Sequence, residues 1–321
     1  MKRSSSAYKI AYDIRPAKQT ERRIILDILK ICSRSDLRDL HNYQYIGFGG
    51  FKFYDFEMLF RHLGISDMVS IEGDKTLIPR CEFNRPFNFI VLKSAWLGDY
   101  LNKSSFKKPI LAWLDYDTAP SGTVVDDIIT IGAKAPAGSF LFVTIDARIP
   151  QGQKTMTTSK RAAQAREEFQ DFSLNPTPFE LEASRYHFYA ERVIWAALTA
   201  ALSSSSETQF VPLMRVFYED TALMATVGAC KCDRSTAENL QRQIRHEFPF
   251  LLPRTKRSVP YQIPPFNFTP RERFLLDVAV TASKPVKKSM QFLKKIGLSK
   301  SVVEDYKRVV RFVPRYFETY I

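Results

Sequence analysis

The chain has 321 residues, of which 45% are hydrophobic, so it can bury a large core and is not a disordered protein. Its formal net charge is +13. No apolar run reaches membrane-spanning length, and none of signal-peptide type follows the basic first residues, so we expect a soluble protein of the cytoplasm. The four cysteines lack partners at metal-ligand spacing, which predicts buried free thiols and no metal site.

The first half of the chain alternates between helical and strand-like patterns. Apolar residues at helical spacing predict a helix over residues 17–30, and a short apolar run at 45–51 breaks into glycines. The later elements are a helix at 53–63, strands at 68–71 and 89–92, a helix at 97–101, a strand at 109–114, a helix at 124–132 and a strand at 139–145. Short apolar strands that alternate with helices indicate a parallel sheet with helices on both faces.

The pattern changes in the second half of the chain. Residues 151–172 and 179–202 favour helices, and a run of serines at 203–206 marks a connection. Two strand-like runs, 210–218 and 222–230, are separated by three residues, which predicts an antiparallel hairpin.

The last 70 residues differ from the rest in charge. Residues 252–321 contain fifteen Lys and Arg and five Asp and Glu, so most of the excess positive charge lies there. We therefore divide the chain into an α/β domain, residues 1–251, and a basic helical appendage, residues 252–321. Helices expected at 274–280, at 287–295 and from residue 301 onward, with a glycine before the last one, resemble a helix-turn-helix.

A basic module on a nearly neutral body indicates a polyanionic partner, and we prefer nucleic acid over an anionic membrane surface. We expect nonspecific phosphate contacts from five side chains: Lys294, Lys295, Lys307, Arg308 and Arg311. The structural alternative is a solvated basic face with no ligand, and a protein partner is a further alternative.

The run Gly47-Phe48-Gly49-Gly50 ends a predicted strand, and Glu72 stands at the tip of the next one. Glycines at such a position let the backbone approach a ligand closely, and an acidic residue on the second strand can hold two ribose hydroxyls. Glycines also make ordinary turns, but the spacing to Glu72 favours a nucleotide-type cofactor site.

Five strand–helix units followed by a hairpin resemble the Rossmann-like fold of class I S-adenosylmethionine-dependent methyltransferases, over roughly residues 8–233. The three glycines match the glycine loop of that superfamily, where the methionine part of the cofactor lies, and Glu72 matches its acidic residue on the ribose. The resemblance implies S-adenosylmethionine as the cofactor, held by Gly47, Phe48, Gly49, Gly50, Glu72 and Asn84.

Four segments are also similar to a narrower family of bacterial O-methyltransferase-like proteins: Arg15-Pro16-Ala17-Lys18, Gly47-Phe48-Gly49, Phe83-Asn84-Arg85-Pro86-Phe87 and Trp113-Leu114-Asp115-Tyr116-Asp117. Two features depart from the superfamily pattern. Tyr45 stands where an acidic residue usually precedes the glycine loop. Asn84 begins a motif similar to the base-binding motif of amino-methyltransferases, but it precedes the third strand instead of following the fourth, so we interpret it as a loop beside the cofactor.

Methyl transfer from a sulfonium needs little covalent help, because the leaving group is already activated and the protein mainly aligns the acceptor. Asp115 and Asp117, at the end of the fourth strand, are the catalytic candidates, since a carboxylate there can act as a base toward a hydroxyl acceptor. The same pair could hold a divalent metal, and an Asp at a strand end is often only a turn former. Asp126 and Asp127 begin the next helix, where acidic residues favour the helix dipole, so we give them a structural role.

The leading hypothesis is a methyltransferase that uses S-adenosylmethionine and acts on nucleic acid or on an acceptor associated with it. The rival is a protein of the same fold without turnover that binds nucleic acid or a protein partner, as the missing acid before the glycine loop suggests. A nicotinamide-dependent oxidoreductase is a third interpretation, and the hairpin after the fifth strand argues against it.

Overall fold

The computed structural model describes residues 15–34, 37, 39–169, 174–202, 207–252, 259–264, 268–281 and 287–314, with the backbone alone at 281 and 287–290. The first residues of the chain and the predicted serine connection at 203–206 lie outside the described residues. No helix in the described part of the chain is long and apolar enough to cross a membrane.

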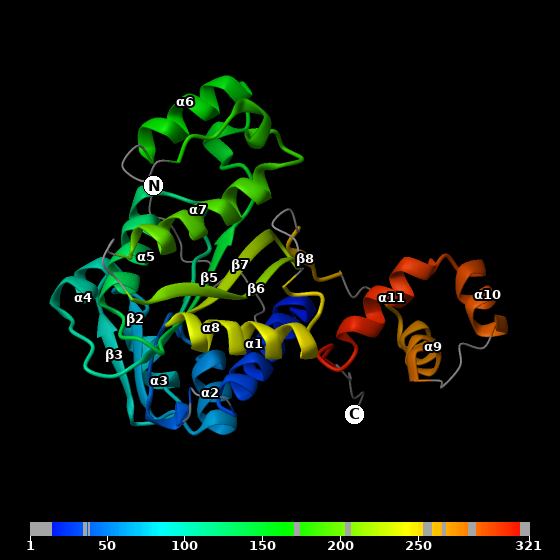
Figure 1. Cartoon of the computed structure of the whole chain (residues 1–321), viewed down its shortest axis with the longest axis horizontal. Helices are drawn as coiled ribbons and strands as arrows, with labels where there is room; N and C mark the ends of the chain where they lie inside the picture. Colours follow the sequence, from blue (N-terminus) through cyan, green and yellow to red (C-terminus); the bar gives the residue numbers. More distant parts are fainter. Residues whose placement is uncertain are drawn as a thin grey trace.

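Within these ranges the body is built on one eight-stranded sheet, in the order β3-β2-β1-β4-β5-β7-β6-β8 (Figure 1). The first five strands are parallel to one another, whereas β7 runs antiparallel between β5 and β6. The strands are β1 (Gln44–Gly47), β2 (Asp67–Glu72), β3 (Ile90–Ser94), β4 (Ile110–Asp115), β5 (Phe140–Asp146), β6 (Gln209–Glu219), β7 (Leu223–Cys232) and β8 (Tyr261–Gln262). The predicted parallel sheet with a final antiparallel hairpin is confirmed.

Helices cover both faces of the sheet (Figure 1). One hydrophobic cluster joins the sheet to α1 (Pro16–Cys32), α2 (Tyr54–Leu63), α3 (Ile78–Asn84) and α8 (Arg234–Glu247). A second cluster on the other face joins it to α4 (Leu97–Lys103), α5 (Gly122–Lys134) and α7 (Tyr186–Ala200). Neighbouring strand residues alternate between the two clusters, as Tyr45 and Ile46 do, because side chains of a strand point to opposite faces in turn.

Between β5 and α7 the chain forms a small lobe that contains α6 (Thr158–Glu168), at the top of Figure 1. Arg161, a buried residue of α6, donates hydrogen bonds to the carbonyl oxygens of Met156 and Leu181. A guanidinium group can serve several carbonyls at once, so this side chain ties the turns of the lobe together.

Among the α-helices and strands of the described residues, α3, α8 and β8 were not predicted, and α3 corrects an interpretation. The segment around Asn84 was expected to be a loop, but its first part is α3, which has a proline in its first turn and buries Cys81 in the core. Helix α8 and strand β8 are the other two. Because β8 pairs with β6, residues beyond the predicted boundary at 251 still belong to the sheet of the body.

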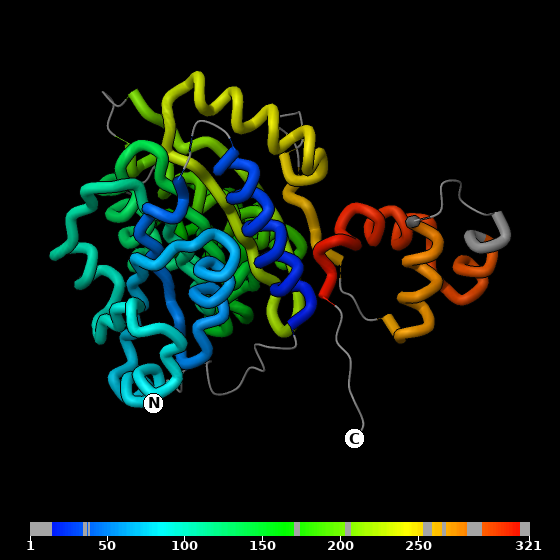
Figure 2. The backbone as a smooth tube through the Cα atoms, turned by 90° about the horizontal axis from the view of Figure 1, so that it is seen from below, coloured from blue at the N-terminus to red at the C-terminus, as the bar shows by residue number. Residues whose placement is uncertain are grey.

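The helices α9 (Pro270–Thr281), α10 (Lys287–Lys295) and α11 (Lys300–Val309) stand beside the body (Figures 1 and 2). Gly297, with a φ of 90°, makes the turn between α10 and α11. Phe312 makes contacts with the body: its ring packs 5.8 Å from that of Phe248, and its carbonyl oxygen accepts a hydrogen bond of 3.2 Å from Arg23.

Candidate functional site

The carboxyl ends of β1, β2 and β4 bring three of the predicted site residues to one edge of the sheet. Gly47 is level with Ser70 of β2 and with Trp113 of β4 in the parallel register. Gly49, Glu72 and Asp115 each follow one of these three residues by two positions. Ligands of open α/β sheets bind at this edge, so the register places these residues where a cofactor and an acceptor meet.

The glycine loop makes a tight turn between β1 and α2. The amide of Gly49 donates a hydrogen bond of 3.2 Å to Oγ of Ser70, and a Cβ atom at Gly49 would lie only 2.6 Å from the same oxygen. Gly50 has a φ of 51°, in the left-handed region that favours glycine. The ring of Phe48 packs 5.2 Å from that of Tyr116, which joins the loop to the segment after β4.

Glu72 is partly buried at the end of β2, and one of its oxygens accepts a hydrogen bond of 2.8 Å from the amide of Asp74. Burial raises the pKa of Glu72, the amide of Asp74 lowers it, and the charges of Asp74 and Asp117 raise it again. Trp96 lies against the next backbone unit, because a Cβ atom on Gly73 would be 2.5 Å from its indole. The sequence reasoning missed Trp96, which is 71% exposed; the signal was an aromatic residue just after the third strand.

Asn84 and Asp117 are placed differently from each other. Asn84 is the exposed last residue of α3, and its amide nitrogen donates a hydrogen bond of 2.8 Å to the carbonyl of Arg80 in the same helix. Asp117 is exposed after the end of β4, and its charge acts on Glu72. The structure therefore brings Asp117 to the edge of the sheet, whereas the side chain of Asn84 turns toward its own helix.

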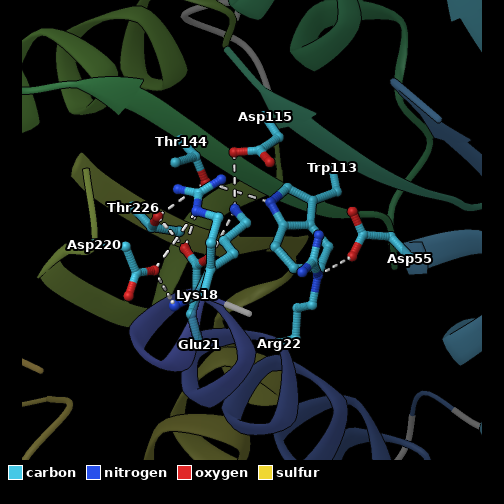
Figure 3. Close-up of polar contacts among 10 residues, drawn as sticks. Lys18, Glu21, Arg22, Asp55, Trp113, Asp115, Thr144, Asp220 and Thr226 are labelled. Carbon is cyan, nitrogen blue, oxygen red and sulfur yellow. Dashed lines mark hydrogen bonds and ion pairs between the residues drawn. The ribbon is translucent and has the colours of Figure 1, made fainter. Parts of the chain in front are cut away.

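Asp115 is held by a lysine from the first helix. Nζ of Lys18 lies 2.8 Å from Oδ1 of Asp115 and 2.7 Å from Oε2 of Glu21 (Figure 3). Lys18 is fully buried and lies 4.8 Å from the ring centre of Trp113. Burial opposes the charge of Lys18, but Asp115 and Glu21 outweigh it and raise the pKa of Lys18 above its ordinary value. The ammonium group is therefore charged and fixes the position of the Asp115 carboxylate.

Glu21 connects this ion pair to the far strands of the sheet. Burial raises the pKa of Glu21, against the opposing effect of Lys18. Glu21 accepts a hydrogen bond from the hydroxyl of Thr226 on β7, which in turn lies 2.9 Å from the hydroxyl of Thr144 on β5. Asp220, in the turn between β6 and β7, accepts hydrogen bonds of 3.0 and 2.9 Å from two backbone amides in the first turn of α1. These contacts hold the start of α1 against the sheet (Figure 3).

The sequence reasoning missed the charged residues on the buried face of α1. The helix was expected to pack through apolar residues, yet Lys18, Glu21 and Arg22 are buried as well. Glu21 and Arg22 are three and four positions after Lys18, so both lie on the same side of the helix as Lys18. The sequence contained a signal for them, because charged residues at the apolar positions of a helix imply oppositely charged partners. Removal of a partner from such a buried pair is strongly destabilising.

The part of the chain that the structure describes contains no group of three or more His, Cys, Asp or Glu side chains arranged to hold a metal ion. At the end of β4, the partner of Asp115 is an ammonium group rather than a second carboxylate. The four cysteines are buried free thiols, as the sequence predicts.

The predicted phosphate contacts lie in the appendage, apart from the glycine loop. All five side chains are exposed: Lys294, Lys295, Lys307, Arg308 and Arg311. Arg308 pairs with Asp305 at 2.7 Å, and the guanidinium of Arg311 lies 5.0 Å from the ring centre of Phe248 on the body. Arg311 therefore also takes part in the contact between appendage and body.

Two acidic residues of α9 are engaged within the appendage. Asp277 accepts a hydrogen bond of 2.7 Å from the hydroxyl of Tyr306, and Glu272 accepts one of 2.8 Å from the amide of Thr269 at the start of the helix. Both carboxylates therefore accept hydrogen bonds from groups inside the appendage.

Residues 10–321 match the model of a family described as "Putative O-methyltransferase". The chain belongs to this family. The match includes α9, α10 and α11, so the appendage is part of the family pattern. Membership confirms the predicted superfamily and S-adenosylmethionine as the cofactor.

Several solved structures are distantly similar to this chain. The N-methyltransferase NodS from Bradyrhizobium japonicum WM9 is 12% identical, with a TM-score of 0.41 over 69% of this chain and 99% of NodS. A second NodS structure holds S-adenosyl-L-homocysteine. A putative O-methyltransferase from Klebsiella pneumoniae is 10% identical, with a TM-score of 0.41 over 71% of this chain and 86% of its own. No curated protein matches the sequence.

Proposed function

We propose that the protein transfers a methyl group from S-adenosylmethionine to an oxygen acceptor at the edge formed by β1, β2 and β4. The observation that carries this proposal is the register that places Gly47, Ser70 and Trp113 level with one another, so that Gly49, Glu72 and Asp115 follow at the same edge of the sheet, in a member of an O-methyltransferase family. S-adenosylmethionine supplies a methyl group already activated on a sulfonium, so the protein has to bind, align and accept a proton.

Each residue at this edge has a role that its chemistry supports. The carboxylate of Glu72 accepts hydrogen bonds from the ribose hydroxyls, and the exposed indole of Trp96 stacks on the adenine ring. The glycine loop lets the methionine end approach the backbone. Asp115 accepts the proton of a hydroxyl acceptor, and Lys18 positions its carboxylate.

Calorimetric titration of S-adenosylmethionine into the wild type and the Glu72→Ala variant tests the cofactor site. We expect micromolar binding by the wild type and a loss of about tenfold or more in the variant, because two hydrogen bonds to a charged group disappear. Glu57→Ala is the matched control, since Glu57 is a carboxylate on α2 that pairs with Arg61 away from the strand ends. A wild type that does not bind at millimolar ligand overturns the proposal.

We propose further that the acceptor is part of a nucleic acid or associated with one, and that α10 and α11 bind its phosphates. The support is the set of exposed basic side chains on these helices and the internal use of Asp277 and Glu272. Basic side chains that neutralise phosphates release counterions, so such binding weakens steeply with salt.

Fluorescence anisotropy with short labelled RNA and duplex DNA tests this second proposal. Charge reversal at Lys294, Lys295 and Lys307 should weaken binding about tenfold or more and reduce the salt dependence. The matched control is charge reversal at three exposed lysines of the body: Lys103, Lys107 and Lys154. Equal losses in both triple variants, or no binding by the wild type, would reject the appendage as the binding surface.

A further inference from the structure

The glycine loop of this chain lacks the acidic residue that usually precedes it, and the structure shows what stands there instead. Tyr45 is buried, and its hydroxyl reaches Gly47, where a Cβ atom would lie 2.5 Å from it. Burial raises the pKa of Tyr45 well above its ordinary value, and the charges of Asp55 and Asp115 add to the effect. Carboxylates from α2 and β4 thus surround the position where β1 has none.

Arg22 of α1 reaches the same place from the other side. Its side chain is only 5% exposed, and its Nε donates a hydrogen bond of 2.6 Å to Oδ1 of Asp55 (Figure 3). The guanidinium carbon lies 5.5 Å from the ring centre of Tyr54. Tyr54 and Asp55 are the first two residues of α2, which begins four residues after Gly50, so Arg22 lies next to the expected position of the methionine end.

One nitrogen of this guanidinium is left without an acceptor. Nη1 of Arg22 is buried and has no hydrogen-bond partner among the residues that the structure describes. Native proteins rarely keep such a donor unpaired in their interior, because it has lost its contacts with water and gained none. A guanidinium presents several donors in one plane and is well suited to hold a second carboxylate while Asp55 occupies the first position.

We propose that Arg22 binds the carboxylate of the methionine moiety of S-adenosylmethionine through its unpaired nitrogen. This inference rests on the proposed function and names a residue outside the glycine loop. The methionine end is a zwitterion, so it adds no net charge to the buried cluster. The ammonium group of the methionine moiety can pair with Asp55 and Asp115, the carboxylates that act on Tyr45, in place of the missing acid.

Two ligands that differ in the amino-acid part test the assignment by calorimetry: S-adenosylhomocysteine carries the carboxylate, and 5′-methylthioadenosine lacks the amino-acid end. The wild type should prefer the first by about tenfold or more. In Arg22→Met this preference should disappear, while the affinity for 5′-methylthioadenosine stays at the wild-type level. Arg23→Met is the matched control, because Arg23 is the exposed next residue of the same helix and should keep the preference.

The outcomes separate this inference from the proposed function. An Arg22→Met variant that retains the preference overturns the inference, whereas a wild type that binds neither ligand overturns the cofactor site itself. A variant that loses both ligands has lost its fold, since it leaves Asp55 buried without a partner. The double variant Arg22→Met, Asp55→Asn is then titrated with the same two ligands. An equal affinity for S-adenosylhomocysteine and 5′-methylthioadenosine supports the assignment, and a retained preference for S-adenosylhomocysteine contradicts it.

Discussion

Asp127 is a buried carboxyl group near the candidate site, and among the residues that the structure describes no cation pairs with it as Lys18 pairs with Asp115. It lies on the buried side of α5 and accepts a hydrogen bond of 2.9 Å from the hydroxyl of Tyr116, the residue that follows Asp115. Burial raises the pKa of Asp127 to about 6, although the bond from Tyr116 lowers it. Its expected role in the helix dipole does not account for this environment.

The raised pKa of Asp127 predicts a pH-dependent stability. The folded protein binds the proton of Asp127 more strongly than the unfolded chain, so this contribution is present below about pH 4 and is lost as the pH rises through about 6. Asp127→Asn keeps an oxygen for Tyr116 and removes the titration. We expect the variant to be more stable than the wild type at pH 8 by up to about 3 kcal/mol, and no more stable at pH 4. Urea unfolding at pH 4 and pH 8 measures the free energy of unfolding of both proteins. An equal difference between variant and wild type at the two pH values would contradict the prediction.

At the scale of single residues, the sequence predicted positions that depend on their own strand. Gly49, Glu72 and Asp115 stand at the ends of apolar runs, and the parallel register follows from the alternation of strands and helices. Lys18 and Trp96 could not be assigned in this way. Their roles depend on contacts with distant parts of the chain, and Lys18 meets its partner 97 residues away.

At the scale of elements, most segments were predicted, but the fourteen-residue helix α8 and the short elements α3 and β8 were not. Helix α3 has seven residues and strand β8 has two, which is too short for a hydrophobic period to show. Strand β8 is placed by its pairing with β6, and nothing within its own two residues indicates a strand. Helix α3 has a proline, Pro79, as its second residue, which could have indicated a helix start after the second strand.

Helix α1 shows how one element can serve several parts of the molecule. Its period of apolar residues predicted a helix over residues 17–30, but three neighbouring charged side chains make contacts in different directions. Lys18 meets Asp115 at the end of β4, and Arg22 meets Asp55 at the start of α2. Arg23 donates to the carbonyl of Phe312 in the appendage. The candidate site and the appendage are therefore both attached to this helix.

At the scale of the whole molecule, the basic charge predicted an appendage, and the structure shows how it is attached. The buried residues Leu276, Val309 and Phe312 belong to the same hydrophobic cluster as Ile24 and Phe248 of the body. The pattern of charge marks the difference between the two parts, whereas the apolar contact between them joins residues far apart in sequence. Composition could therefore predict the module but not its place on the body.

Phe312 provides a test of this attachment. It is 2% exposed, and its replacement by Ala removes the ring that packs on Phe248, a change that costs about 3–5 kcal/mol when it empties a buried site. Because the ring lies between two parts of the molecule, we expect the loss to fall mainly on the attachment. Amides of α9, α10 and α11 should exchange with solvent at least about tenfold faster in Phe312→Ala, while the affinity for S-adenosylmethionine should stay unchanged.

Phe292→Ala makes the same substitution at a ring on α10 that is 46% exposed, and it should leave exchange at the wild-type rate. Unchanged exchange in Phe312→Ala would show that other contacts hold the appendage, and the bond from Arg23 would be the first of these to remove.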